Sequence, residues 1–144
     1  MGVIAETVKA DAQAALKEGD RRKAAALRMI QDVLQQEVKL GKGDELAALQ
    51  REQKKRLEAA EAYEEAGREE QAADERYEAE LIGGYLPAQL DDAELAEMVD
   101  EAVAETGAEG PSDMGKVMGV LKERAAGRAD GKRLSTAVRE RLGA

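Results

Sequence analysis

The sequence predicts an all-α protein with an N-terminal four-helix domain, residues 1–86, and a smaller C-terminal three-helix domain, residues 91–144. Two observations support this fold class: apolar residues recur at helical spacing in seven segments, and charged residues make up 37% of a chain with only two prolines. The 144 residues suffice for one average domain or for two small helical ones. One continuous bundle or coiled coil is the alternative architecture.

Glycines and short acidic residues set the limits of the first two helices. The first is expected over residues 3 to about 18, since Gly19 favours the left-handed conformation that ends helices. Asp20 then caps a second helix over about residues 21–40, which a pair of glycines ends. The apolar faces expected of these two helices are Ile4, Val8, Ala12, Ala15 and Leu16, and Leu27, Ile30, Leu34 and Val38.

The third and fourth helices carry sparser apolar faces. The third follows Asp44 and breaks at Gly67, and the fourth ends at Gly83-Gly84. Neither sustains a heptad pattern, which disfavours a coiled coil. The expected apolar positions are Leu46, Leu49, Leu57, Ala60 and Tyr63 in the third helix, and Ala73, Tyr77 and Leu81 in the fourth.

A hinge is expected at Tyr85-Leu-Pro-Ala-Gln-Leu90, because Pro87 lacks an N–H group and disfavours helix at Leu86. Three helices then follow, and Asp91 opens the first of them with a capping box. Ser112 and Asp130 are the caps expected for the next two, and Gly107 and Gly127 close the first two. Their apolar faces are Leu95, Met98, Val99, Ala102 and Val103; Met114, Val117, Met118, Leu121 and Ala125; and Leu134, Val138 and Leu142.

The composition excludes several kinds of chemistry. There is no Cys for a disulfide or thiolate metal site, no His for the usual general base or metal ligand, and no Asn for N-glycosylation. The N-terminus has no apolar run of signal-peptide length, and no segment could span a membrane. We therefore expect a soluble cytoplasmic protein without a cofactor, a metal or a membrane partner.

Charge is distributed unevenly along the chain. From Pro111 to the end there are eight basic and four acidic residues, a net charge of +4, whereas the preceding part carries −13. A basic tail on an acidic body indicates an anionic partner such as nucleic acid. The other basic run, Lys54-Lys55-Arg56, has carboxylates within helical reach, so a solvated face with ion pairs is favoured there.

Two catalytic interpretations of the tail fail on its residues. Gly110 to Lys116 matches the first seven positions of a phosphate-binding P-loop, but Val117 replaces the magnesium-binding Ser or Thr and Asp113 places a negative charge in the cradle. Ser112 with Lys116 could form a nucleophile pair, but helix capping explains Ser112 better. No nucleotide site and no catalytic residue is expected.

The glycines of the tail suggest close approach by another backbone. Gly115, Gly119 and Lys122 share one side of their helix, where glycine costs about 1 kcal/mol relative to alanine. This side could pack tightly against another helix, or it could meet an RNA backbone. The turn from Gly127 to Arg133 offers three further cations, Arg128, Lys132 and Arg133, at a helix start that suits phosphate, although a solvated turn is equally consistent.

Three blocks resemble the YqeY family, also called GatB/YqeY domain proteins. They are Ala66-Gly67-Arg68, Tyr85-Leu-Pro-Ala-Gln-Leu90, and Asp113-Met-Gly-Lys-Val-Met-Gly119 followed by Gly127-Arg-Ala-Asp-Gly-Lys132. The resemblance implies an N-terminal helical domain and a small three-helix domain similar to the tail of the B subunit of the aspartyl/glutamyl-tRNA amidotransferase. It also implies RNA-contacting positions at Gly115, Lys116, Gly127, Arg128 and Lys132.

The expected function is therefore a tRNA-related binding module, with tRNA and the tRNA amidotransferase or aminoacyl-tRNA machinery as expected partners. Kinship to a carbon–nitrogen ligase with glutamine as amido-N-donor follows from the resemblance, but no residue of this chain supplies an amidase nucleophile. The alternatives are an accessory protein that acts through an amidotransferase partner and a protein-interaction module without RNA. No aromatic residue lies near the tail to stack bases, so recognition would rest on RNA shape or backbone.

Overall fold

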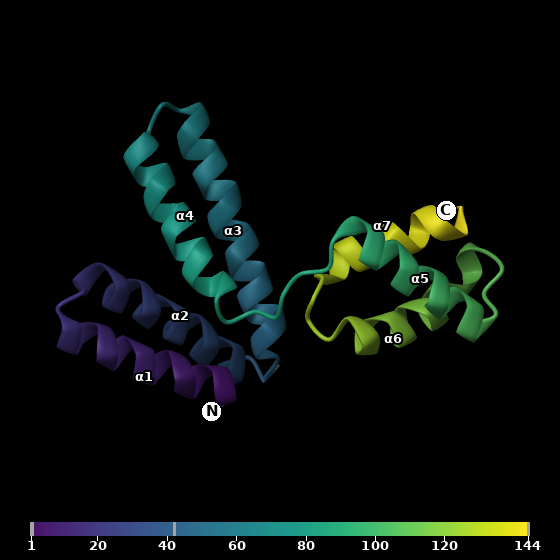
Figure 1. Ribbon diagram of the computed structural model, residues 1–144, viewed down its shortest axis with the longest axis horizontal. Helices are drawn as coiled ribbons and strands as arrows, with labels where there is room; N and C mark the ends of the chain where they lie inside the picture. The colour runs from purple at the N-terminus through teal and green to yellow at the C-terminus, as the bar shows by residue number, and fades with distance from the viewer. Residues whose placement is uncertain (1, 42, 144) are drawn as a thin grey trace. The chain divides into compact units, whose positions relative to one another are not determined.

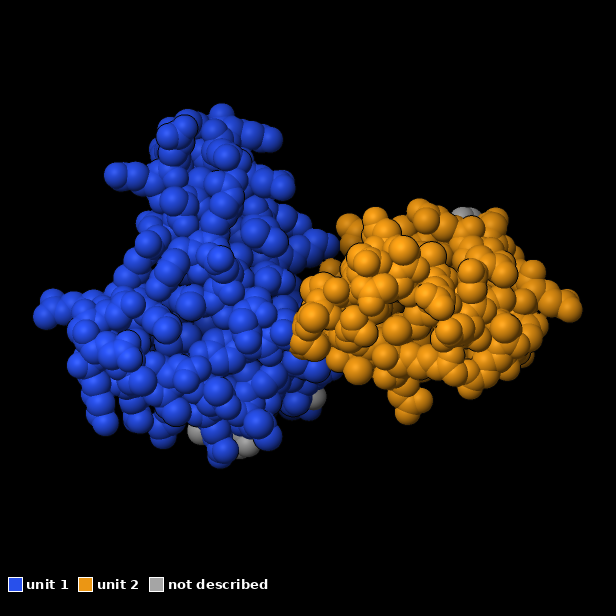
Figure 2. Space-filling view, viewed as in Figure 1, with its two compact units in different colours: residues 1–86 blue, residues 87–144 orange. Residues whose placement is uncertain are grey.

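A computed structural model describes residues 2–41 and 43–143, and these residues form seven α-helices, one short 3-10 turn and no strand (Figure 1). The all-α prediction is confirmed. The chain divides into two compact units, residues 1–86 and residues 87–144, which Figure 2 colours separately. We call them unit 1 and unit 2.

Unit 1 consists of two helical hairpins (Figure 1). The first pairs α1 (Val3–Glu18) with α2 (Arg21–Lys39), and the second pairs α3 (Glu45–Glu65) with α4 (Glu69–Gly83). Gly19 ends α1 in the left-handed conformation, as predicted. The carboxylates of Asp20 and Asp44 cap α2 and α3 by accepting hydrogen bonds from the backbone N–H groups of residues 23 and 47.

The core of unit 1 is built from alanine, valine, leucine and isoleucine on the inner faces of these hairpins. Two predicted core positions are wrong by one residue, because the preceding residue of the helix is buried instead. Val38 is 55% exposed, whereas the neighbouring Glu37 is 3% exposed, and Ala73 is exposed while Ala72 is buried. Leu16 and Leu57 are exposed as well. Apolar spacing defines a stripe, but the neighbouring helix decides which edge of that stripe is covered.

Unit 2 packs α5 (Asp92–Thr106), α6 (Met114–Ala125) and α7 (Gly131–Leu142) around one apolar core. The predicted apolar faces of all three helices point into this core. Asp91 and Glu94 form the predicted capping box, and Asp130 caps α7. Leu90, which the sequence placed in the hinge, is buried in the same core.

The predicted cap at Ser112 is wrong. Ser112 lies instead within a 3-10 turn, η1 (Pro111–Asp113), and α6 begins after this turn, at Met114. The Asp113 carboxylate accepts a hydrogen bond of 3.0 Å from the backbone N–H of Glu109, and this bond lowers the pKa of Asp113 below its ordinary value. α6 ends at Ala125, and the next two residues, Ala126 and Gly127, both have positive φ.

None of the helices that the structure describes is long and apolar enough to cross a membrane.

Candidate nucleic-acid interface

The segment Ala88–Leu90 lies against the α6–α7 connection within unit 2. The backbone N–H of Leu90 donates to the carbonyl of Arg128 at 2.8 Å, and Arg128 Nε donates to the carbonyl of Ala88 at 2.9 Å. Arg133 Nη1 donates to the carbonyl of Leu90 at 2.5 Å. Two sequence blocks that are about forty residues apart are thus joined, and two of the predicted RNA-contacting arginines hold that junction.

The carboxylates of α5 neutralise most arginines of the tail. Arg128 and Arg133 pair with Glu94 and Asp92 at 3.4 and 2.9 Å. The remaining pairs are Arg124 with Glu101 and Glu105, and Arg141 with Asp100. Because α5 packs on α6 and α7, the charge division drawn at Pro111 from the sequence does not correspond to a division in the structure. Unit 2 as a whole has eight basic and twelve acidic residues, a net charge of −4.

Two lysines flank the α6–α7 connection without an ionic partner among the described residues. Lys122 lies in the last turn of α6 and Lys132 in the first turn of α7, and both are exposed. Lys116 is also exposed but lies 3.8 Å from the Asp113 carboxylate. Arg139 on α7 is a further exposed cation without a described partner, and the sequence analysis missed it because no motif includes it.

The glycine side of α6 is open. A Cβ atom added to Gly115 or Gly119 would meet no neighbouring atom within 4 Å in the described structure, and both residues are exposed. The interpretation that these glycines allow tight helix packing inside the fold is therefore wrong. Lys122 shares this side of the helix, and the half-buried Met118 borders it. The two glycines therefore leave an open surface beside a lysine.

The start of α7 carries its own negative charge. The Asp130 carboxylate accepts a hydrogen bond of 2.7 Å from the backbone N–H of Arg133. A phosphate group at this helix end would therefore lie close to a carboxylate. The repulsion between the two negative charges would offset the attraction of the helix dipole for phosphate. Lys122 and Lys132 therefore remain the cations of this region that have no ionic partner among the described residues.

Within the basic run of unit 1, Arg56 forms an ion pair with a carboxylate on its own helix, as predicted, whereas Lys54 and Lys55 are exposed without an ionic partner among the described residues. Arg56 lies 3.0 Å from Glu52 on its own helix, and it also lies 3.2 Å from Glu75 and 3.0 Å from Glu78 on α4. It therefore ties α3 to α4. Among the described residues, no group of three or more acidic side chains could hold a metal ion.

A comparison with protein-family models identifies one family in this chain. The model described as Yqey-like protein matches residues 5–142, which is almost the whole sequence. A search of curated proteins finds none that matches the chain significantly.

Proposed function

This chain belongs to the YqeY family, and on that premise we propose that it is a non-catalytic tRNA-binding module whose contacts lie on unit 2. The proposal includes kinship between unit 2 and the tail of the B subunit of the glutamine-dependent tRNA amidotransferase. In that enzyme the tail helps to hold tRNA while catalysis takes place elsewhere.

The observation that carries this proposal is the pair of lysines at the α6–α7 connection. The arginines around them are occupied by α5 carboxylates and by backbone carbonyls, whereas Lys122 and Lys132 project from both sides of one short turn without a described partner. The open glycine side of α6 beside Lys122 allows a ribose–phosphate backbone to approach closely.

The charges and side chains of unit 2 also limit the kind of binding. No aromatic residue lies within residues 87–144, so bases have no platform on which to stack. Contacts to phosphate and ribose then dominate, and these report RNA shape rather than sequence. A net charge of −4 on unit 2 makes the affinity modest and strongly dependent on salt.

The same negative charge favours a second candidate, in which the chain is an accessory that docks on a basic surface of an amidotransferase or another protein. A pull-down from cell lysate, with and without ribonuclease, distinguishes the two. Partners that survive ribonuclease treatment support the accessory function, and partners that depend on RNA support direct binding of tRNA.

The direct test is tRNA binding by the full chain across a series of salt concentrations. Replacing Lys122 and Lys132 together with alanine should weaken binding and reduce the slope of log affinity against log salt by about 1 to 2. The matched control removes two exposed lysines of unit 1, Lys9 and Lys17, and should leave the slope unchanged. Equal affinity of wild type and the Lys122/Lys132 variant would overturn the proposal.

A further inference from the structure

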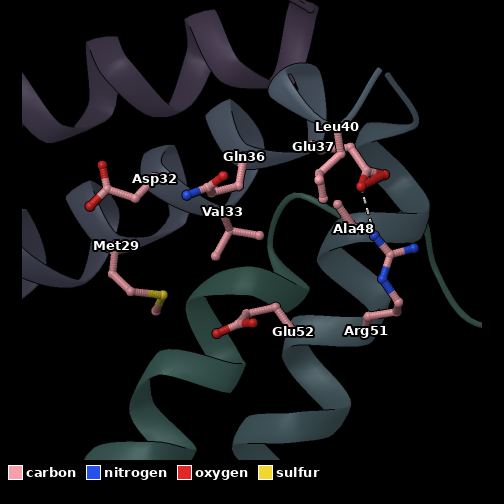
Figure 3. Close-up of a pocket in the computed structure, with 9 residues that line it drawn as sticks. All are labelled: Met29, Asp32, Val33, Gln36, Glu37, Leu40, Ala48, Arg51 and Glu52. Carbon is pink, nitrogen blue, oxygen red and sulfur yellow. Dashed lines mark hydrogen bonds and ion pairs between the residues drawn. The ribbon is translucent and has the colours of Figure 1, made fainter. Parts of the chain in front are cut away.

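Unit 1 contains a pocket between α2 and α3 that the proposed function does not use (Figure 3). Its volume of about 360 Å³ is at the lower end of the range for small-ligand sites, so it matches a single small group. One wall comes from α2, whose lining residues recur at helical spacing, and the other comes from α3. The residues used below are Met29, Asp32, Val33, Glu37, Leu40 and Arg51.

Glu37 is the unusual residue of this pocket. Its side chain is only 3% exposed, and it is the one buried charged residue of the described structure. Its Oε1 atom accepts a hydrogen bond of 2.8 Å from Arg51, whereas its Oε2 atom is buried with no hydrogen-bond partner (Figure 3). A buried carboxylate oxygen without a donor costs free energy, so a donor supplied from outside would be bound favourably.

The pocket selects for a cation. Asp32 and Glu52 line it together with Glu37, and Arg51 is the only basic residue among the lining residues, which gives a net charge of −2. Asp32 has no described ionic partner, and Glu52 already pairs with Arg56. The unsatisfied atom is therefore an anionic acceptor in an acidic environment, which a positively charged donor complements.

The apolar lining selects for an aliphatic stem. Met29 and Val33 on α2, and Leu40 directly after it, line the pocket together with the acidic residues. No aromatic ring lines the pocket, so a flat or quaternary cation has no face to bind. An unbranched alkyl chain that ends in a compact ammonium group matches both kinds of lining residue.

We infer that this pocket binds a primary alkylammonium group, with Glu37 as the acceptor and Met29, Val33 and Leu40 around the alkyl stem. Arg51 and Leu40 lie beside Glu37 in Figure 3, and their side chains are 60% and 66% exposed. Both can therefore rotate aside, so the ammonium reaches Glu37 in competition with the Arg51 guanidinium. The alkylammonium group belongs either to a free polyamine or to a lysine side chain of a partner protein.

The test is an NMR titration of the ¹⁵N-labelled full chain with n-hexylammonium, followed at the backbone amides of residues 33, 36 and 48. The neutral analogue n-hexanol should bind at least about tenfold more weakly, because a charge-assisted hydrogen bond contributes about 1.5–3 kcal/mol. Equal binding of the amine and the alcohol would show that the pocket recognises only the alkyl chain, and would overturn the inference.

Two variants of neighbouring residues should act in opposite directions. Glu37→Gln should weaken n-hexylammonium binding about tenfold, and Arg51→Ala should strengthen it because the competing cation is removed. The matched controls on the exposed surface of α3 are Glu58→Gln and Lys55→Ala, which make the same changes in charge outside the pocket. If each control changes binding as much as its partner variant, general charge explains the effect and the inference fails.

The same titration identifies the source of the ammonium group. Spermidine and a helical peptide with a single lysine on an apolar face are each added in competition with n-hexylammonium. Displacement by spermidine at the lower concentration assigns the pocket to a free polyamine, and displacement by the peptide assigns it to a partner protein. If neither displaces the probe from wild type, the inference is overturned.

Discussion

Arg128 and Arg133 have a structural role in this fold, although their sequence motif suggests phosphate binding. Both belong to a cluster of cations that resembles a phosphate site in the sequence, and both donate hydrogen bonds to backbone carbonyls of Ala88 and Leu90 instead. Those carbonyls lie outside any helix, so they need donors from elsewhere in the chain. The planar guanidinium group reaches a carbonyl and a carboxylate at once, which an ammonium group does less well.

Arg128→Ala should therefore lower the stability of the fold. The variant leaves the carbonyl of Ala88 without its Nε donor and removes the pair with Glu94, and we expect a loss of about 1–2 kcal/mol in the free energy of unfolding. Urea denaturation followed by circular dichroism measures this loss. Lys132→Ala, which removes an unpaired cation four residues away, should change stability by less than about 0.5 kcal/mol. Similar losses for both variants would contradict the structural role of Arg128.

Single residues from distant elements also complete helix ends that the local sequence leaves open. The first turn of α1 has no side-chain cap of its own. The Glu45 carboxylate of α3 accepts hydrogen bonds from the backbone N–H groups of Ile4 and Ala5 at 3.2 and 2.8 Å. A negative charge at this position also complements the helix dipole of α1. Because the cap is some forty residues away, no pattern near α1 predicts it.

At the scale of an element, α6 carries two glycines that its own fold does not require. Neither has a positive φ, and a Cβ atom on either would meet no atom of another described element within 4 Å. Glycine lowers helix stability relative to alanine, so the two positions weaken α6 without improving its packing. Residues that lower the stability of a helix without improving its packing are typical of a surface that contacts a partner.

Gly119→Ala should therefore stabilise the chain and weaken tRNA binding. Gly119 lies within α6, and the gain should be about 0.5–1 kcal/mol in the free energy of unfolding. Gly115→Ala should give less, because Gly115 lies in the first turn of the helix. Thermal melting gives the stability, and binding to tRNA at constant salt gives the second readout. A variant that is more stable and binds tRNA equally well would show that the open side of α6 does not contact RNA.

At the scale of the whole molecule, unit 2 begins earlier than Asp91. The chain from Pro87 onward belongs to this unit, and Leu90 is 3% exposed within its core. Ala88 and Leu90 also provide the carbonyls that Arg128 and Arg133 bind. The segment that the sequence marks as a hinge is therefore, over residues 88–90, an integral part of unit 2.

Two fragments test this boundary. Residues 87–144 should fold alone, whereas residues 91–144 lack Leu90 and should be less stable by about 1.5–3 kcal/mol, the contribution of one buried leucine side chain. A core of this size gives only marginal stability. The shorter fragment should therefore be largely unfolded at room temperature. Circular dichroism at low and high temperature compares them. Equal helicity and equal melting of the two fragments would place the boundary at Asp91.

The prediction of elements from the sequence succeeded because its signals are local. A helical period, an aspartate before the first turn and a glycine after the last all act within a few residues, and they located α1, α2 and α5 closely. The cap at Ser112 was wrong because the bond that orders this segment comes from Asp113, one residue later. The predicted core of unit 1 was shifted at Val38 and Ala73, because the hydrophobic period tolerates a rotation of one residue.

The sequence by itself determined the helical class, most helix ends and the family, because each depends on residue types at short, regular spacing. Only the tertiary structure decided which cations are available, because ion pairs between α5 and the tail form across the core of unit 2. It also decided that Glu37 rather than Val38 is buried, and that one oxygen of this carboxylate lacks a donor. Such contacts join residues far apart in the chain, and their energies depend on distance and burial. Neither quantity can be inferred from the spacing of residue types within a short stretch of sequence.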